Sequence, residues 1–207
     1  LMADVIGTAG ATRFLVIDLH AGQIQGFFDI PGDELTARHI LVDYFRKKAI
    51  PDAVVIAPDI GASRRARNFA EDLDLPLAII EKRRQADGRD TQQLNLIGHV
   101  QSRNAIIFDD EIDTGGTICK AAQFVRARGV RDVYACATHA LLSPPHGVEN
   151  LRAANLRELV VTNTVYISPE KIQALQPFLR ILSVADLLAE VIRRIHLGIS
   201  VGELFNE

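Results

Sequence analysis

The chain has 207 residues, of which 48% are hydrophobic and 24% are charged, and its formal net charge is -3 at pH 7. This composition is typical of a globular protein with a sizeable core, and the small net charge excludes a general affinity for nucleic acid, so that any phosphate binding must be local. No apolar run reaches the roughly 18 residues of a membrane helix and no signal peptide is recognisable, so we expect no membrane association.

Short apolar runs alternate with helical patterns along most of the chain. The first six residues already read as the middle of an amphipathic helix, which indicates a fragment of a longer protein. After them we predict, in chain order, strand 14–18, helix 35–48, strand 54–58, helix 63–73, strand 77–80, strand 105–109, helix 116–128, strand 133–138, helix 148–154, strand 159–162, helix 169–175, strand 181–183 and helix 184–196.

This alternation predicts an α/β fold, with a mainly parallel sheet and helices on both of its faces. In such sheets, ligands bind beyond the carboxyl ends of the strands. Polar residues gather at or just after several predicted strand ends, namely 18–20, 59–62, 81–84, 109–117 and 138–139. We therefore expect these segments to form a site.

The stretch 106–118 carries the sharpest signal, because an apolar strand leads into Asp109 and Asp110, then a glycine-containing loop, then a helix. The two carboxylates can hold ribose hydroxyls or a metal bound to them. The loop can offer backbone N–H groups and hydroxyls to a phosphate at the helix N-terminus. The alternative is an ordinary strand-to-helix turn with solvated carboxylates. We interpret the stretch as a seat for a phosphorylated sugar, with the loop residues Asp113, Thr114, Gly115, Gly116 and Thr117.

Two further segments suit the phosphate side of such a site. His20 follows the first strand and can bind a metal that bridges phosphates, or it can be a structural histidine. Asp59 can bind Mg²⁺, with the amides of 61–62 meeting a pyrophosphate. The alternative interpretation of this segment is a helix capped by Ser63, with exposed arginines at 64, 65 and 67.

Lys82 and Arg84 follow the strand at 77–80 and open a segment that contains glycine and aspartate. Cations on a mobile loop can close over a transition state and neutralise developing charge. A solvated basic turn is the alternative. The two cysteines, Cys119 and Cys136, lack the spacing of a metal site, so we expect buried, reduced thiols and a cytoplasmic protein.

Taken together, these residues resemble one family, ribose-phosphate pyrophosphokinase (phosphoribosyl pyrophosphate synthetase). The likeness covers nearly the whole chain in order. The Gln-Ile-Gln-Gly-Phe-Phe run at 23–28 is its most specific part. The matching stretches are 18–31, 57–61, 82–84, 109–117, 161–164, 192–196, 200–201 and 204–205.

The resemblance implies transfer of pyrophosphate from ATP, with Mg²⁺, to the C1 hydroxyl of ribose 5-phosphate, which releases AMP. It implies that His20 and Asp59 contact Mg²⁺–ATP and that Lys82 and Arg84 are the catalytic cations. Asp109 and Asp110 would hold the ribose hydroxyls, and the loop at 113–117 would hold the 5-phosphate. Glu111 departs from the family, where an apolar residue is more usual.

The resemblance also implies two phosphoribosyltransferase-like (type I) domains and a homo-oligomer, often a hexamer. Residues 1–33 would be the remnant of the first domain, 34–185 the second domain, and 186–207 a helix and tail that pack back toward the first. Because an upstream segment of the family is missing, we expect the fragment alone to be inactive. Two alternatives stay open: a phosphoribosyltransferase that uses phosphoribosyl pyrophosphate, and a non-catalytic regulatory subunit of a synthetase.

Overall fold

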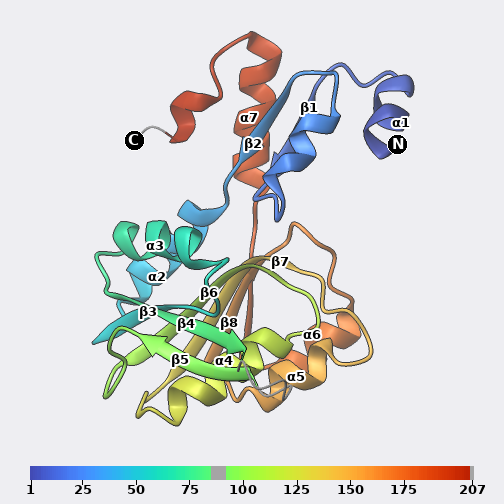
Figure 1. Cartoon of the computed structure of the whole chain (residues 1–207). Helices are drawn as coiled ribbons and strands as arrows, with labels where there is room; N and C mark the ends of the chain where they lie inside the picture. The colour runs from blue at the N-terminus through green and yellow to red at the C-terminus, as the bar shows by residue number, and fades with distance from the viewer. Residues whose placement is uncertain (85–91, 206–207) are drawn as a thin grey trace. The chain divides into compact units, whose positions relative to one another are not determined.

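The computed structural model describes residues 1–84 and 92–205, with side chains described except at 82–84, 92–93 and 205. The chain divides into two compact units (Figure 1). The smaller comprises Leu1–Ala37 with Ser183–Glu207, and the larger is Arg38–Leu182. The division at 33 and 185 drawn from the sequence lies a few residues from these boundaries. Among the described residues, no helix is long and apolar enough to cross a membrane.

The larger unit contains a seven-stranded sheet in the order β5-β4-β3-β6-β7-β8-β9. All neighbouring strands are parallel except β4 and β5, which pair antiparallel at one edge. The predicted parallel sheet is confirmed, but the antiparallel edge strand was not foreseen. The strands are β3 (Ala53–Ala57), β4 (Leu77–Arg84), β5 (Gln92–Ile97), β6 (Asn104–Ile112), β7 (Val133–Ala140), β8 (Glu158–Thr162) and β9 (Leu179–Leu182).

Helices cover both faces of this sheet, as the alternating pattern predicted (Figure 1). On one face, Ile106 of β6 belongs to an apolar cluster with α2 (Arg38–Lys48) and α3 (Ser63–Asp72). On the other face, Ile107 belongs to a cluster with α4 (Gly116–Arg126), α5 (Gly147–Ala153) and α6 (Pro169–Leu175). Successive residues of a strand point to opposite faces, so β6 contributes to both cores.

Several predicted boundaries were wrong, and tertiary pairing explains why. The helix predicted to start at 35 starts at Arg38, because Leu35 belongs to a short strand, β2 (Gly32–Leu35). Strand β6 runs three residues beyond 109, because its pairing with β7 continues to Ile112 and Ala140. Cys119 and Cys136 are free and buried, which confirms the expectation of buried thiols.

The smaller unit brings together the two ends of the chain. Strand β1 (Phe14–Ile17) pairs in parallel with β2, and Leu35 of β2 forms a small buried cluster with Val191 and Val201. Val191 belongs to helix α7 (Ala185–Leu197). The remaining elements are α1 (Met2–Thr8) and two 3-10 helices, η1 (Gly22–Phe27) and η2 (Gly202–Phe205).

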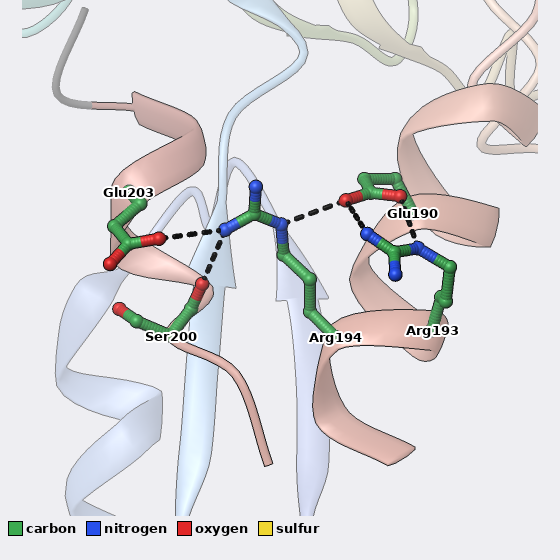
Figure 2. A network of polar contacts seen from close by, with 5 residues as sticks. All are labelled: Glu190, Arg193, Arg194, Ser200 and Glu203. Atoms are coloured by element: carbon green, nitrogen blue, oxygen red, sulfur yellow. Dashed lines mark hydrogen bonds and ion pairs between the residues drawn. The ribbon is translucent and has the colours of Figure 1, made fainter. Parts of the chain in front are cut away.

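A polar network fastens the end of α7 to the segment that follows it (Figure 2). Arg194 donates from Nε to Glu190 Oε1 over 2.8 Å and from Nη1 to the carbonyl oxygen of Ser200 over 2.8 Å. It also meets Glu203 at 3.2 Å, while Arg193 donates two hydrogen bonds of 2.8 Å to Glu190. Arg194 thus ties α7 to the turn that follows it, while Arg193 bonds to Glu190 within the helix.

Candidate functional site

The candidate site lies where strand β6 extends beyond the end of its neighbour β3. Pairing of the two strands ends at Ile56 and Ile107, whereas pairing of β6 with β7 continues to Ile112. Beyond Ile107, β6 therefore has a strand partner on one edge only. Asp109 and Asp110 lie in this stretch, inside the strand, and the expectation that they end the strand was wrong.

Asp110 is buried, with only 2% of its surface exposed, and it forms an ion pair with an arginine of α3. The distance from Arg65 Nη2 to Asp110 Oδ1 is 2.9 Å. In the sequence analysis Arg65 had no role beyond that of an exposed helix residue, but the structure brings it to Asp110. Its neighbours Arg64 and Arg67 are exposed. Arg65 adjoins the buried face formed by Ala62, Ala66 and Phe69, which was the available sequence signal.

Asp109 differs from its neighbour in exposure and in hydrogen bonding. It is half-buried, and its Oδ1 accepts a hydrogen bond of 3.0 Å from the backbone N–H of Asp110. Burial, followed by the adjacent Asp110 side chain, raises the pKa of Asp109 to about 7, and the charge of Asp59 acts in the same direction. Two adjacent carboxylates thus have different environments, which is common in functional sites.

The turn between β6 and α4 is made at a glycine. Gly115 is in the left-handed region at φ +69° immediately before α4, and a Cβ there would lie 3.0 Å from the carbonyl oxygen of Gly147. Asn150 Nδ2 donates to the carbonyl oxygen of Thr114 over 2.8 Å. A glycine is needed at position 115 because both backbone conformation and space exclude a side chain. Asp113, Thr114 and Thr117 are exposed around the first turn of α4.

A pocket of about 350 Å³ lies beside this loop within the larger unit. Three of the predicted loop residues line it: Thr114, Gly116 and Thr117. The sequence analysis did not single out Lys120, one turn into α4, which adds a positive charge to the wall. The other lining residues are apolar, namely Pro58, Ile80, Leu94 and Ala121. The pocket therefore combines a polar, positively charged rim with an apolar floor.

Asp59 lies just after β3, and its negative charge contributes to the raised pKa of Asp109. Its Oδ1 accepts a hydrogen bond of 3.0 Å from the N–H of Ala62, so Asp59 fixes the start of α3. The alternative of a helix cap by Ser63 does not hold, because the Ser63 hydroxyl instead donates to the carbonyl oxygen of Ile60. Within the described ranges, no group of three or more potential metal ligands occurs. Mg²⁺ needs no such group, since it commonly binds one or two carboxylates together with water and substrate phosphates.

His20 belongs to the smaller unit, where its side chain is exposed just after β1. The preceding turn is fixed by Asp18, which has φ 44° and accepts a hydrogen bond of 2.9 Å from the N–H of Ala37. In the larger unit, His139 Nδ1 lies 2.9 Å from the Thr164 hydroxyl, which itself donates to the carbonyl oxygen of Thr138. This network ties the carboxyl ends of β7 and β8 together.

Lys82 and Arg84 lie within β4, so the expectation that a loop begins at once after residue 80 was wrong. Their backbones pair with those of Leu94 and Gln92 in β5, and Leu94 lines the pocket. The side chains of both cations lie outside the described part of the structure, as do residues 85–91. The strand pair nevertheless places position 82 beside the pocket wall.

Residues 87–206 match the model of the phosphoribosyl synthetase-associated domain family. The chain is 52% identical to a ribose-phosphate pyrophosphokinase of Synechococcus elongatus, with 99% of the chain and 61% of that protein covered. It is 47% identical to a chloroplastic ribose-phosphate pyrophosphokinase 1 of Arabidopsis thaliana, with 99% of the chain and 50% of that protein covered.

Among solved structures, the phosphoribosylpyrophosphate synthetase of Mycobacterium smegmatis superposes with a TM-score of 0.84 at 40% identity. The match covers 95% of this chain and 62% of that one. The chain thus spans about three fifths of the length of the first relatives that it matches.

Proposed function

The chain belongs to the phosphoribosyl synthetase-associated domain family, and from this premise we propose that it carries the ribose 5-phosphate site of a ribose-phosphate pyrophosphokinase. The reaction transfers the β,γ-pyrophosphoryl group of ATP to the C1 hydroxyl of ribose 5-phosphate, giving phosphoribosyl pyrophosphate and AMP. The observation that carries the proposal is the loop of residues 113–117, wrapped around the start of α4 beside a pocket of about 350 Å³.

In this proposal the loop binds the 5-phosphate. Backbone N–H groups at the start of α4 and the hydroxyls of Thr114 and Thr117 would donate hydrogen bonds to the phosphate oxygens. Lys120, on the pocket wall, would add a positive charge. The carboxylate pair on β6 lies only a few residues before this loop, and in this proposal the pair serves the sugar hydroxyls.

In the chemical step, the C1 oxygen would attack the β-phosphorus of ATP. The bond from that phosphorus to the oxygen bridging it to the α-phosphorus would break, AMP would leave with the electron pair, and the C1 hydroxyl would lose its proton. Catalysis of such transfers depends mainly on positioning and on neutralising charge. We assign the second task to Lys82 and Arg84, at the end of β4 next to the pocket wall.

The proposal includes Mg²⁺, which would neutralise the ATP phosphates. Asp59 is the candidate carboxylate ligand, because Mg²⁺ prefers oxygen donors, and His20 is the second candidate ligand by family resemblance. We further propose a homo-oligomer, as the family resemblance implies, and a cytoplasmic location, which the two buried free thiols support.

The test has two parts. Isothermal titration of the 207-residue chain with ribose 5-phosphate should reveal saturable binding, and Gly115→Val should abolish it while Gly10→Val, in open space at a similarly left-handed residue of the smaller unit, should not. AMP formation from ATP, Mg²⁺ and ribose 5-phosphate should then be measured for the chain joined to the part of the Synechococcus elongatus relative that it does not cover. Absence of both binding and AMP would refute the proposal.

A further inference from the structure

The two neighbouring carboxylates of β6 are not equivalent. Asp110 is 2% exposed, whereas Asp109 is half-buried. A carboxylate that is fully buried cannot offer its oxygens to a ligand without leaving its own surroundings. The difference in exposure therefore suggests different tasks for the two residues.

The direction of Asp110 follows from the strand. Ile106 and Phe108, four and two residues before Asp110, belong to the apolar cluster on the α3 face of the sheet. Because side chains alternate along a strand, Asp110 faces α3 as well. There Arg65, in the first turn of the helix, meets it at 2.9 Å. The ion pair compensates a charge that burial among apolar side chains would otherwise make costly.

Residue 110 is in turn linked to Asp109 through the backbone. The N–H of Asp110 donates to Asp109 Oδ1 over 3.0 Å, which orients the Asp109 carboxylate. A chain of contacts thus runs from Arg65 to the Asp110 side chain, and from the Asp110 backbone to the Asp109 side chain. The raised pKa of Asp109 agrees with this arrangement, because its causes are burial, then the adjacent Asp110 side chain, and the charge of Asp59 adds to them.

We infer that Arg65 is a positioning residue that holds Asp110 against α3, so that Asp109 is the carboxylate that meets the sugar hydroxyls. This inference rests on the proposed function, because it assigns a division of work within the same ribose 5-phosphate site. It departs from the sequence-based expectation that both carboxylates hold the ribose. It also assigns a role to Arg65, for which the sequence motif had indicated none.

The test compares affinities for ribose 5-phosphate and inorganic phosphate, measured by titration calorimetry on the 207-residue chain. Their ratio reports the sugar contacts, because both ligands use the phosphate loop. Asp109→Asn should reduce the ratio by about tenfold, the usual effect of losing a hydrogen bond to a charged group, and should leave phosphate affinity unchanged. Asp110→Asn should lower the unfolding temperature by several degrees and reduce the ratio about threefold or less.

The arginine is tested by rescue. Arg65→Met should reduce the ratio by about threefold to tenfold, and Arg65→Lys should restore most of it, since a lysine keeps the charge. Arg64→Met, at an exposed position of the same helix, is the matched control and should change neither ratio nor stability. In the double variant of Arg65→Met and Asp110→Asn, the losses should not add, because the two residues act as one unit.

Two results would overturn the inference while leaving the proposed function intact. One is a larger loss of the ratio in Asp110→Asn than in Asp109→Asn. The other is an Arg65→Met variant that is folded and keeps the wild-type ratio, which would mean that Arg65 is only structural. A wild-type chain that binds phosphate as tightly as ribose 5-phosphate would instead refute the proposed function, and the sugar role of Asp109 with it.

Discussion

In the unit of residues 38–182, both faces of a seven-stranded sheet are covered by helices, and the central strands are buried along most of their length. In the unit formed by 1–37 and 183–207, a two-stranded sheet is accompanied by a small cluster of the buried residues Leu35, Val191 and Val201. Here exposed arginine–glutamate contacts supplement the apolar core (Figure 2).

The comparison teaches where a precise site can be built. Burial of apolar surface supplies most of the stability of a fold. Close packing of that buried surface keeps the neighbouring groups in fixed positions. The larger unit can therefore hold the buried carboxylate of Asp110. In the smaller unit the ion pairs of Figure 2 lie at the surface, where such pairs contribute little each and are screened by salt.

The largest effect should come from the centre of the larger sheet. Ile107→Ala removes a fully buried side chain and should lower the free energy of unfolding by about 4 kcal/mol. Ile60→Ala, at a position that is 56% exposed, is the control and should change it by less than about 0.5 kcal/mol. Urea unfolding followed by circular dichroism measures both. Equal effects of the two variants would contradict the described core.

The next effect concerns Asp109, whose pKa in the folded chain is raised to about 7. The folded state binds the proton more tightly than the unfolded chain, so the free energy of unfolding should fall as pH rises from about 4 to 7. Asp109→Asn should remove this dependence and should be more stable than the wild type at pH 8 by about 2 kcal/mol.

Thermal unfolding from pH 5 to pH 8 checks this prediction. The exposed residue Asp113 provides the control, and Asp113→Asn should keep the wild-type pH dependence. An Asp109→Asn variant whose stability still falls between pH 5 and pH 7 would show that another group titrates there.

A matched pair of valines compares the two cores directly. Val125 of α4 and Val191 of α7 are both fully buried within helices. Val125→Ala should cost about 2 kcal/mol and Val191→Ala about 1 kcal/mol, because the smaller cluster can relax more readily around the cavity. Hydrogen exchange resolves the local effect in each unit. If Val191→Ala is the more costly, the smaller core is the more tightly packed of the two.

The smallest effect is expected at Glu190, in the network of Figure 2. Hydrogen bonds from Arg193 and then Arg194 lower the pKa of Glu190 to about 2. The contribution of the ionised Glu190 to the stability of the folded state is therefore present above pH 4.5, and it is lost as the pH falls from there toward 2. Glu190→Gln should remove this acid dependence at low salt, and 1 M salt should mask the difference. Hydrogen exchange in α7 is the measurement, with the exposed Glu71→Gln as control.

Much of the secondary structure could be predicted because it depends on local pattern. The apolar runs located six strands of the larger sheet, and helix 169–175 was predicted with its observed bounds. Strand β5 was missed, since its only strand partner is the antiparallel β4 and its residues carry no strong apolar period of their own. The extension of β6 was missed for a similar reason, because β7 provides the partner that continues it.

For the candidate site, the sequence determined the segment in which the loop between a strand and a helix forms. A strand, a pair of glycines and a helix are contiguous in the chain, and Gly115 takes the left-handed conformation that favours glycine. Only the tertiary structure decided how the two carboxylates differ. Arg65 lies 45 positions before Asp110 in the sequence, and folding of α3 over β6 brings the two side chains to 2.9 Å. Burial and pairing depend on such distant contacts, so no local pattern could predict that Asp110 is buried beside Arg65 while Asp109 is only half-buried.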